Sequence, residues 1–534
     1  MIIKNQINIS MIKPIKLLWG FALFIPIFIH FFLLQKYLIN FPFWVDDFTF
    51  IQIIKQKNQS SFFEFIPLLF EAHNEIHRIV FSRLVVLLIY FFSGEFSFKT
   101  FTILANIQMI GILIPFYLYI KKKAWSVWHL IPISLLLFSG YGNFDNYSLI
   151  GVVSHTSALL FLVWIAYWLI CSKQRILPII LSLAMPFVST EGLAILPLVA
   201  FILFQEKHKL TLPFLLFAFI IIYYYPHETK VEVPAINLSK FLSIAYGFIS
   251  FMGISRIPIS DTYRTLICEI QGFSILTFVV ILLIKANRNH RLKEFAFPAI
   301  ILYLIAATGI LICLGRFALG PISLIATSER FNSYGLLPLI AIYLMSIETW
   351  GNVKLFLPII FCYYLASIYF AIPHLELYHN RQKGDLINTY YQNESVNYDI
   401  GENHTLLKNP IEYHFQFPID LIPSNKKIIN SLQNANFFLE KGVFKYERDK
   451  NMHYFNLTHP HFVEKQSNSR YLVLQSKIKT NYFLFVPLLN DNNTKNTTRI
   501  AQCSLSKPIK ISDFNFFLVS LNGNQIKQTW KIKI

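Results

Sequence analysis

The sequence predicts an all-α polytopic membrane domain with about eleven transmembrane helices and a few interfacial helices, followed by a mainly β soluble C-terminal domain. Long apolar runs recur as far as about residue 372, and hydrophobic residues make up 54% of the 534-residue chain while charged residues make up 14%. After Pro373 the apolar runs shorten, and Asn and Lys become frequent. We therefore expect a membrane domain over 1–372 and a soluble domain over 373–534.

The net charge of +18 does not indicate a nucleic-acid partner. Most of the basic residues form short clusters between apolar runs, at 121–123, 173–175, 207–209 and 285–293. Such clusters mark the cytoplasmic ends of membrane spans. The sequence thus predicts that these loops and the N-terminus lie in the cytoplasm.

The apolar runs can then be divided into crossing and non-crossing helices. The first run is longer than a signal-peptide core and lacks a small-residue cleavage site, so we expect a retained span. Keeping every basic cluster on one side requires that two runs do not cross. We choose 79–92, which is short, and 241–257, which Gly247, Gly253 and Arg256 interrupt, as interfacial helices. The expected spans are 17–39, 98–120, 126–140, 151–171, 176–190, 191–204, 210–225, 266–285, 295–315, 333–348 and 354–372.

This topology places most of the non-basic polar chemistry on the outer face. The outer segments are the part of the chain after 373 and the loops 40–97, 141–150, 189–192, 226–265 and 316–332. The cytoplasmic loops are short and basic. The working surface is therefore expected outside.

The C-terminal domain carries strand and turn signals. We expect a helix near 380–392 and then mainly strands, arranged as a small sandwich. Asn522-Gly523 separates two strand-like runs, which is a strong hairpin signal. A second strand pair is expected within 470–489.

Two adjacent acids, Asp46 and Asp47, follow the first span directly. A carboxylate there could cap the next helix in water. It could also take a proton from an attacking hydroxyl, and its neighbour could raise its pKa by repulsion or help to hold a divalent cation, Mg²⁺ or Mn²⁺.

This arrangement resembles the GT-C class of integral-membrane glycosyltransferases. The shared features are an acidic pair after span one, interfacial helices, six further spans before the next large outer loop, and an outer soluble domain. In architecture the resemblance covers about residues 10–372 and is nearest to protein mannosyltransferases, the aminoarabinose transferase of lipid A and arabinofuranosyltransferases. It implies a polyprenyl-phosphate-linked sugar donor and a catalytic role for Asp46 and Asp47.

Four outer arginines are predicted to bind the donor phosphate, because a guanidinium can hold an anion bidentately as it leaves. They are Arg316 and Arg330, and less strongly Arg256 and Arg264. The alternative is that they extend to lipid headgroups.

The segment "EAHNEIHR" could line a substrate pocket. Glu75 and His77 could bind sugar hydroxyls and Arg78 a phosphate, with His73 nearby. His73 and His77 have the spacing of two metal ligands, but the HExxH pattern is lacking, so no metal site is predicted. An amphipathic helix on headgroups is the alternative. Glu191, near the outer end of a span, is a further pocket candidate.

Together these features predict an inverting sugar transfer from a polyprenyl phosphate to an acceptor hydroxyl, in cell-envelope glycan or glycolipid assembly. The partners would be the lipid-linked donor, a glycan, lipid or protein acceptor, and membrane lipid. Frequent Ile, Lys, Asn and Phe indicates a bacterium, so the inner membrane is expected. The alternatives are a transporter or flippase of lipid-linked glycans, which would need polar residues in mid-span, and an O-antigen polymerase or ligase.

Overall fold

The computed structural model describes most of the membrane domain and the framework of the C-terminal domain. The described ranges are 9–42, 47–71, 78–140, 147, 152–172, 174–224, 237–254, 261–315, 331–351, 353–392, 418–437, 443–449, 452–458, 469–479, 481–490, 498–504, 511–522 and 524–532.

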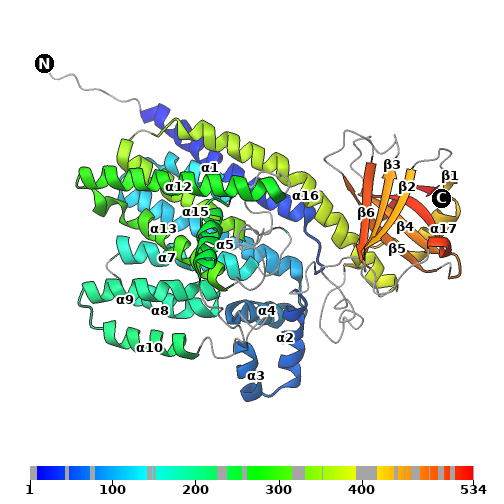
Figure 1. Cartoon of the computed structure of the whole chain (residues 1–534), viewed down its shortest axis with the longest axis horizontal. Helices are drawn as coiled ribbons and strands as arrows, with labels where there is room; N and C mark the ends of the chain where they lie inside the picture. Colours follow the sequence, from blue (N-terminus) through cyan, green and yellow to red (C-terminus); the bar gives the residue numbers. More distant parts are fainter. Residues whose placement is uncertain are drawn as a thin grey trace.

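The first part of the chain forms a helical bundle, beside which the strands form a separate sheet (Figure 1). Six helices of the described ranges are long and apolar enough to cross a membrane, which supports a membrane protein. They are α1 (Ile9–Tyr37), α5 (Phe98–Lys122), α7 (Val152–Cys171), α12 (Asp261–Arg288), α13 (Ala296–Gly315) and α16 (Phe356–Gln392).

The other expected spans correspond to helices that do not meet this criterion. These are α6 (Leu130–Leu137), α8 (Ile176–Ala184), α9 (Ile195–Gln205), α10 (Thr211–Tyr224) and α15 (Asn332–Trp350). Short 3-10 segments extend several of them, for example Val127–His129 before α6 and Met185–Phe187 after α8. Eleven crossings thus stay a prediction.

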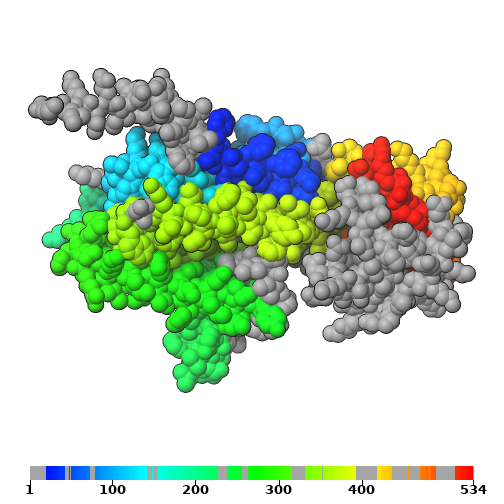
Figure 2. All heavy atoms as spheres, turned by 90° about the horizontal axis from the view of Figure 1, so that it is seen from above, coloured from blue at the N-terminus to red at the C-terminus, as the bar shows by residue number. Residues whose placement is uncertain are grey.

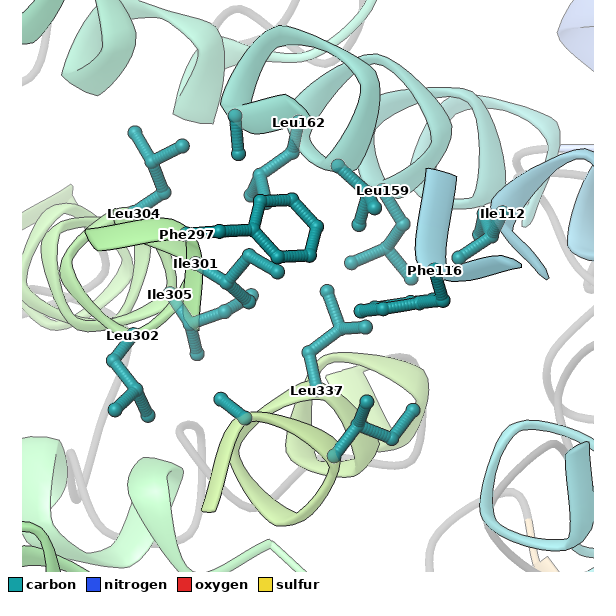
Figure 3. Close-up of a cluster of buried hydrophobic side chains, with 14 of the residues drawn as sticks. Ile112, Phe116, Leu159, Leu162, Phe297, Ile301, Leu302, Leu304, Ile305 and Leu337 are labelled. Atoms are coloured by element: carbon teal, nitrogen blue, oxygen red, sulfur yellow. The ribbon is translucent and has the colours of Figure 1, made fainter. Parts of the chain in front are cut away.

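A large apolar core holds the bundle together. Phe297 of α13 lies among Leu159 and Leu162 of α7, Phe116 of α5 and Leu337 of α15 (Figure 3). The rings of Phe116 and Phe297 lie 5.9 Å apart, centre to centre, in an edge-on arrangement. Close packing of this kind fixes the relative positions of the four helices.

The basic clusters gather at one end of the bundle. Lys122 Nζ donates to the carbonyl of Cys171 at 2.6 Å, and Lys123 pairs with the buried Glu348 at the end of α15. Arg291 also lies 3.5 Å from Glu348. Arg175 forms two hydrogen bonds with Glu206, which directly precedes the cluster at 207–209. The shared end is the geometry that the positive-inside prediction requires.

The opposite end carries three short helices between α1 and α5. They are α2 (Asp47–Gln59), α3 (Phe62–Phe70) and α4 (Val80–Ser93). The side-chain oxygen of Asn40, just after α1, accepts hydrogen bonds from Ser97 Oγ at 3.2 Å and Lys99 N at 3.1 Å. The chain therefore leaves and re-enters the bundle at the same end. The 14 residues of α4 span only about 21 Å, less than a hydrocarbon core of about 30 Å.

The other helix expected at the interface is α11 (Leu238–Met252), which packs backbone to backbone on α12. A Cβ on Gly272 would lie 1.8 Å from the carbonyl oxygen of Ile249, and one on Gly253 would lie 1.9 Å from that of Cys268. Gly253, one of the glycines that were expected to interrupt this segment, therefore permits the close approach of the two helices.

The last membrane helix, α16, is continuous over 37 residues and passes through Pro373. Its length of about 55 Å exceeds the hydrocarbon core by about 25 Å, so its C-terminal part extends beyond a bilayer. It lies alongside α1 (Figures 1 and 2). The helix expected near 380–392 is the end of α16, and the expected domain boundary falls inside one helix.

The C-terminal domain contains α17 (Asn425–Gln433) and eight strands in the order β1-β8-β7-β4-β5-β6-β3-β2. The strands are β1 (Asn436–Phe437), β2 (Val443–Asp449), β3 (Met452–Thr458), β4 (Ser469–Ser476), β5 (Phe483–Asn490), β6 (Thr498–Ser504), β7 (Phe514–Asn522) and β8 (Gln525–Ile532). Neighbouring strands are antiparallel except β1 and β8. Both expected pairs, β4 with β5 and β7 with β8, are confirmed.

The strands form one sheet, whereas a sandwich would have two. β5 links the two parts of the sheet on either side of it. Its residues up to Pro487 pair with β4, and those from Leu488 pair with β6. Phe455 of β3 nevertheless contacts Phe516 of β7, at 5.9 Å between ring centres, although three strands separate them in the sheet. The sheet therefore curls over its own core as one continuous sheet, in place of the two separate sheets of the expected sandwich.

Candidate functional site

The start of α2, which includes the predicted catalytic Asp47, lies where the bundle meets the C-terminal domain. One buried cluster there, which we call the junction cluster, contains Ile39 and Phe41 after α1, Phe50 and Ile51 of α2, Leu386 and Ile387 of α16, and Tyr471 and Phe485 of the sheet. The junction cluster thus joins four separate parts of the chain around the connection from α1 to α2.

Asp47 is the first residue of α2 and is 1% exposed. The next turn of α2 places Phe50 and Ile51 in the junction cluster, which draws the start of the helix inward. An acid in the first turn is favoured by the helix dipole, but burial of a carboxylate away from water is costly. Asp46 lies outside the described residues.

One face of the α16 extension closes against the end of α1. His379 Nδ1 donates to the carbonyl of Tyr37 at 2.9 Å, and Gln382 Nε2 donates to the carbonyl of Phe41 at 3.1 Å. Tyr37 in turn donates its hydroxyl to Glu376 at 3.2 Å. The spacing of residues 376, 379, 382 and 383 puts them near one another on the helix. This face therefore forms a wall beside the segment that leads to the aspartates.

Lys383 is the cation of that wall and is only 3% exposed. Burial lowers the pKa of its ammonium from 10.5 to about 8. Burial also lowers the pKa of His379, which the hydrogen bond to Tyr37 partly offsets. Asp385, two residues beyond Lys383, is likewise buried. A buried lysine and a buried aspartate outside the hydrocarbon region are typical of functional or ion-paired sites.

Sequence reasoning missed Lys383 and Asp385 because the chain after Pro373 was interpreted as a soluble tail. The signal that could have found them is the run of polar residues at helical spacing directly after the last apolar run. Leu386 and Ile387 follow Lys383 by one turn, as Phe50 and Ile51 follow Asp47. Asp47 and Lys383 therefore each lie one helical turn before two residues of the junction cluster.

Arg78 was predicted to bind a phosphate, but its guanidinium lies on the carbonyl of Phe70, at the end of α3. Arg83 Nη1 donates to the carbonyls of Leu68, Leu69 and Glu71 at 2.7 to 2.9 Å. The last carbonyls of a helix lack partners within it, so these two arginines cap α3. The neighbouring pocket candidates His73, Glu75 and His77 lie outside the described residues.

Two further predicted site residues are described, and the structure places them away from the members of the junction cluster. Glu191 is buried in a 3-10 turn, Thr190–Ala194, that leads into α9 and the bundle core. Arg264 lies half-buried near the start of α12. Arg256, Arg316 and Arg330 fall outside the described ranges. Over the part of the chain that is described, no group of three His, Cys, Asp or Glu side chains could hold a metal ion.

Polar side chains also lie inside the bundle. His30 of α1 is fully buried, with Nε2 at 2.7 Å from Asn106 Oδ1 of α5 and Nδ1 at 2.8 Å from the hydroxyl of Tyr147. Thr156 and Ser157 of α7 both donate to Gln108 of α5. The transporter alternative requires polar residues in mid-span, and these groups are of that kind, although they satisfy one another by hydrogen bonds.

No family model matches the sequence, and neither a curated protein nor a solved structure shows significant similarity to it.

Proposed function

We propose that the protein is a membrane glycosyltransferase that moves a sugar from a polyprenyl phosphate to an acceptor hydroxyl outside the membrane. The observation that carries the proposal is the burial of Asp47 at the start of α2, one helical turn before Phe50 and Ile51 of the junction cluster. This region lies at the end of the bundle opposite the basic loops. A lipid-linked donor would present its phosphate near that depth.

The chemistry would be a single displacement. The acceptor oxygen attacks the anomeric carbon of the sugar while the bond from that carbon to the phosphate oxygen breaks. Asp46 or Asp47 takes the proton of the acceptor hydroxyl, and the lipid phosphate leaves as an anion. A cation stabilises the charge that develops on it. Lys383 joins Arg316, Arg330, Arg256 and Arg264 as a candidate for that role.

Amide substitutions test the role of the acids. Asp46→Asn and Asp47→Asn keep shape but lose basicity, so at least one should lower transfer by about 10²–10⁴-fold. Because Asn caps helices about as well as Asp, a capping role predicts normal activity. Asp420→Asn, at an exposed site in the C-terminal domain, is the matched control.

The assay uses purified protein and lipid-linked sugars extracted from membranes. Each variant must match wild type in its elution and thermal stability before its rate is compared. Wild-type turnover by both amide variants would remove the main support for glycosyl transfer.

The second candidate is a flippase of lipid-linked glycans, which the buried His30, Asn106 and Tyr147 favour because polar groups in spans can line a substrate path. Protein reconstituted in liposomes with a fluorescent polyprenyl-phosphate sugar distinguishes the two. Exchange of the lipid between leaflets without product would support transport, whereas product without exchange would support transfer.

A further inference from the structure

Helix α3 is almost entirely apolar yet largely exposed. Its sequence over Phe62–Phe70 has seven large apolar side chains in nine residues, and Phe65 alone among them is buried. Phe62 is 72% exposed and Phe63 is 83% exposed. A short helix with so little buried area is not stable in water on its own, so this surface needs an apolar environment.

Helix α4 continues this pattern with a regular stripe. Leu84, Leu88, Phe91 and Phe92 are exposed and follow the i, i+4, i+7, i+8 spacing of one helix face. The opposite face packs inward through Val80, Ser82, Val86 and Ile89. Arg83 joins the two helices by its bonds to the end of α3.

The charged groups that contact α3 lie at its two ends. The carboxylate of Glu64 accepts hydrogen bonds from the backbone N and the hydroxyl of Ser61, at 2.9 and 2.8 Å. These bonds lower the pKa of Glu64 and keep its charge at the N-terminal end of the helix. Its opposite end is capped by Arg78 and Arg83. The helix is thus polar at both ends and apolar along its length.

The orientation of α3 fits the surface of a bilayer. In Figure 1, the axis of α3 is crosswise to the axes of α8, α9 and α10. The helix lies nearer the end of the bundle that carries the C-terminal domain. Phe70 at the end of α3 packs edge-on against Phe187, which follows α8, and Ile180 of α8 is 56% exposed. The apolar surface of α3 therefore continues an apolar surface of the bundle that would already face lipid.

We propose that α3 and the exposed stripe of α4 form a wedge that inserts into the outer leaflet at the boundary between headgroups and acyl chains. The occupant of this surface is the lipid bilayer itself. Aromatic side chains favour that boundary. The proposal concerns how the protein sits in the membrane and does not depend on the reaction at the junction.

Spin-label accessibility tests the wedge. The full chain, with its five cysteines replaced, carries one nitroxide at Phe63→Cys or Leu88→Cys and is placed in nanodiscs of phosphatidylethanolamine and phosphatidylglycerol. Both sites should collide more with oxygen, which concentrates in the acyl region, than with a water-soluble nickel chelate. Lys57→Cys, at an exposed site on α2, is the control and should show the reverse.

Two results would overturn the proposal. Nickel access at residue 63 equal to that at residue 57 would mean that α3 faces water. Shielding of residues 63 and 88 from both reagents would mean that protein, such as a second copy of the chain, covers the wedge. Because both side chains are exposed, their replacement removes no core packing, and normal elution of the labelled protein confirms the fold.

Discussion

The side-chain amide of Asn388 in α16 forms two hydrogen bonds with the backbone of Phe485 in β5. Its Nδ2 donates to the carbonyl oxygen at 3.0 Å, and its Oδ1 accepts from the amide nitrogen at 2.7 Å. Asn388 is fully buried, and the carbonyl of nearby Asn380 accepts a bond from Tyr471 of β4. The end of the last membrane helix is therefore fastened to the middle of the sheet.

Asn388→Ala should loosen this attachment. The change removes two hydrogen bonds and leaves two buried backbone groups unsatisfied, at a cost of about 2–4 kcal/mol. Amide exchange at Phe485 should accelerate, and the melting temperature should fall. Asn430→Ala, exposed on α17 of the same domain, should leave both unchanged. Wild-type exchange at Phe485 in the Asn388 variant would contradict the role of this side chain.

The titration of Lys383 predicts a pH-dependent stability. Its pKa is about 8 in the folded protein and 10.5 ordinarily, so folding is opposed by the buried charge below pH 8 and this opposition disappears as the pH rises toward 10.5. The 2.5-unit difference corresponds to about 3 kcal/mol at most.

Melting curves of wild type and Lys383→Met between pH 7 and 10 provide the test. The wild-type midpoint should rise relative to the variant as the pH increases, because methionine carries no proton. Lys426→Met, at an exposed position, should follow wild type throughout. A constant difference between wild type and Lys383→Met would show that the lysine keeps its ordinary pKa.

Gly272→Ala should prevent normal packing of α11 on α12. Alanine usually stabilises a helix by about 1 kcal/mol relative to glycine, but the added Cβ would lie 1.8 Å from a backbone oxygen that cannot rotate away. Thermal stability in detergent should fall sharply. Gly20→Ala is the matched control, because a Cβ there has no atom within 4 Å. Equal stability of the two variants would refute the contact.

The two ends of α5 should lie on opposite sides of the membrane. In a background without native cysteines, a membrane-impermeant maleimide applied outside should modify Lys99→Cys and spare Lys122→Cys. Lys99 is near the return of the chain from α4, whereas Lys122 contacts the end of α7 at the basic end of the bundle. Permeabilised membranes provide the control, in which both react. Outside labelling at 122 would reverse the orientation.

Local patterns in the sequence predicted much of the fold. The apolar runs gave the long helices, the lysine and arginine clusters predicted one shared end, and Asn522 marked the hairpin of β7 and β8. Each of these features depends on residues that are close together in the sequence. The passage of α16 through Pro373 did not follow, because proline removes one hydrogen bond and usually breaks a helix in water, whereas packing in a membrane protein tolerates it.

The candidate site was predictable only in part. Asp47 could be selected because an acid after a long apolar run is conspicuous in the sequence. Lys383 lies more than 300 residues later in a polar segment, and only the packing of α16 against Tyr37 and Phe41 brings it to the same cluster. Similarly, the contact between Arg78 and the carbonyl of Phe70 was not predictable, because only the folded position of α3 supplies that carbonyl.

The continuity of α16 determines where the chain can be cut. A membrane fragment ending at residue 372 would lose His379 and Gln382, which bind the backbone of the segment leading to Asp46 and Asp47. A soluble fragment beginning at 373 would carry a helix with one apolar face that the bundle no longer covers. Each part of the chain is covered by residues of the other part. A truncation that preserves the membrane part therefore has to retain the helix through Gln392.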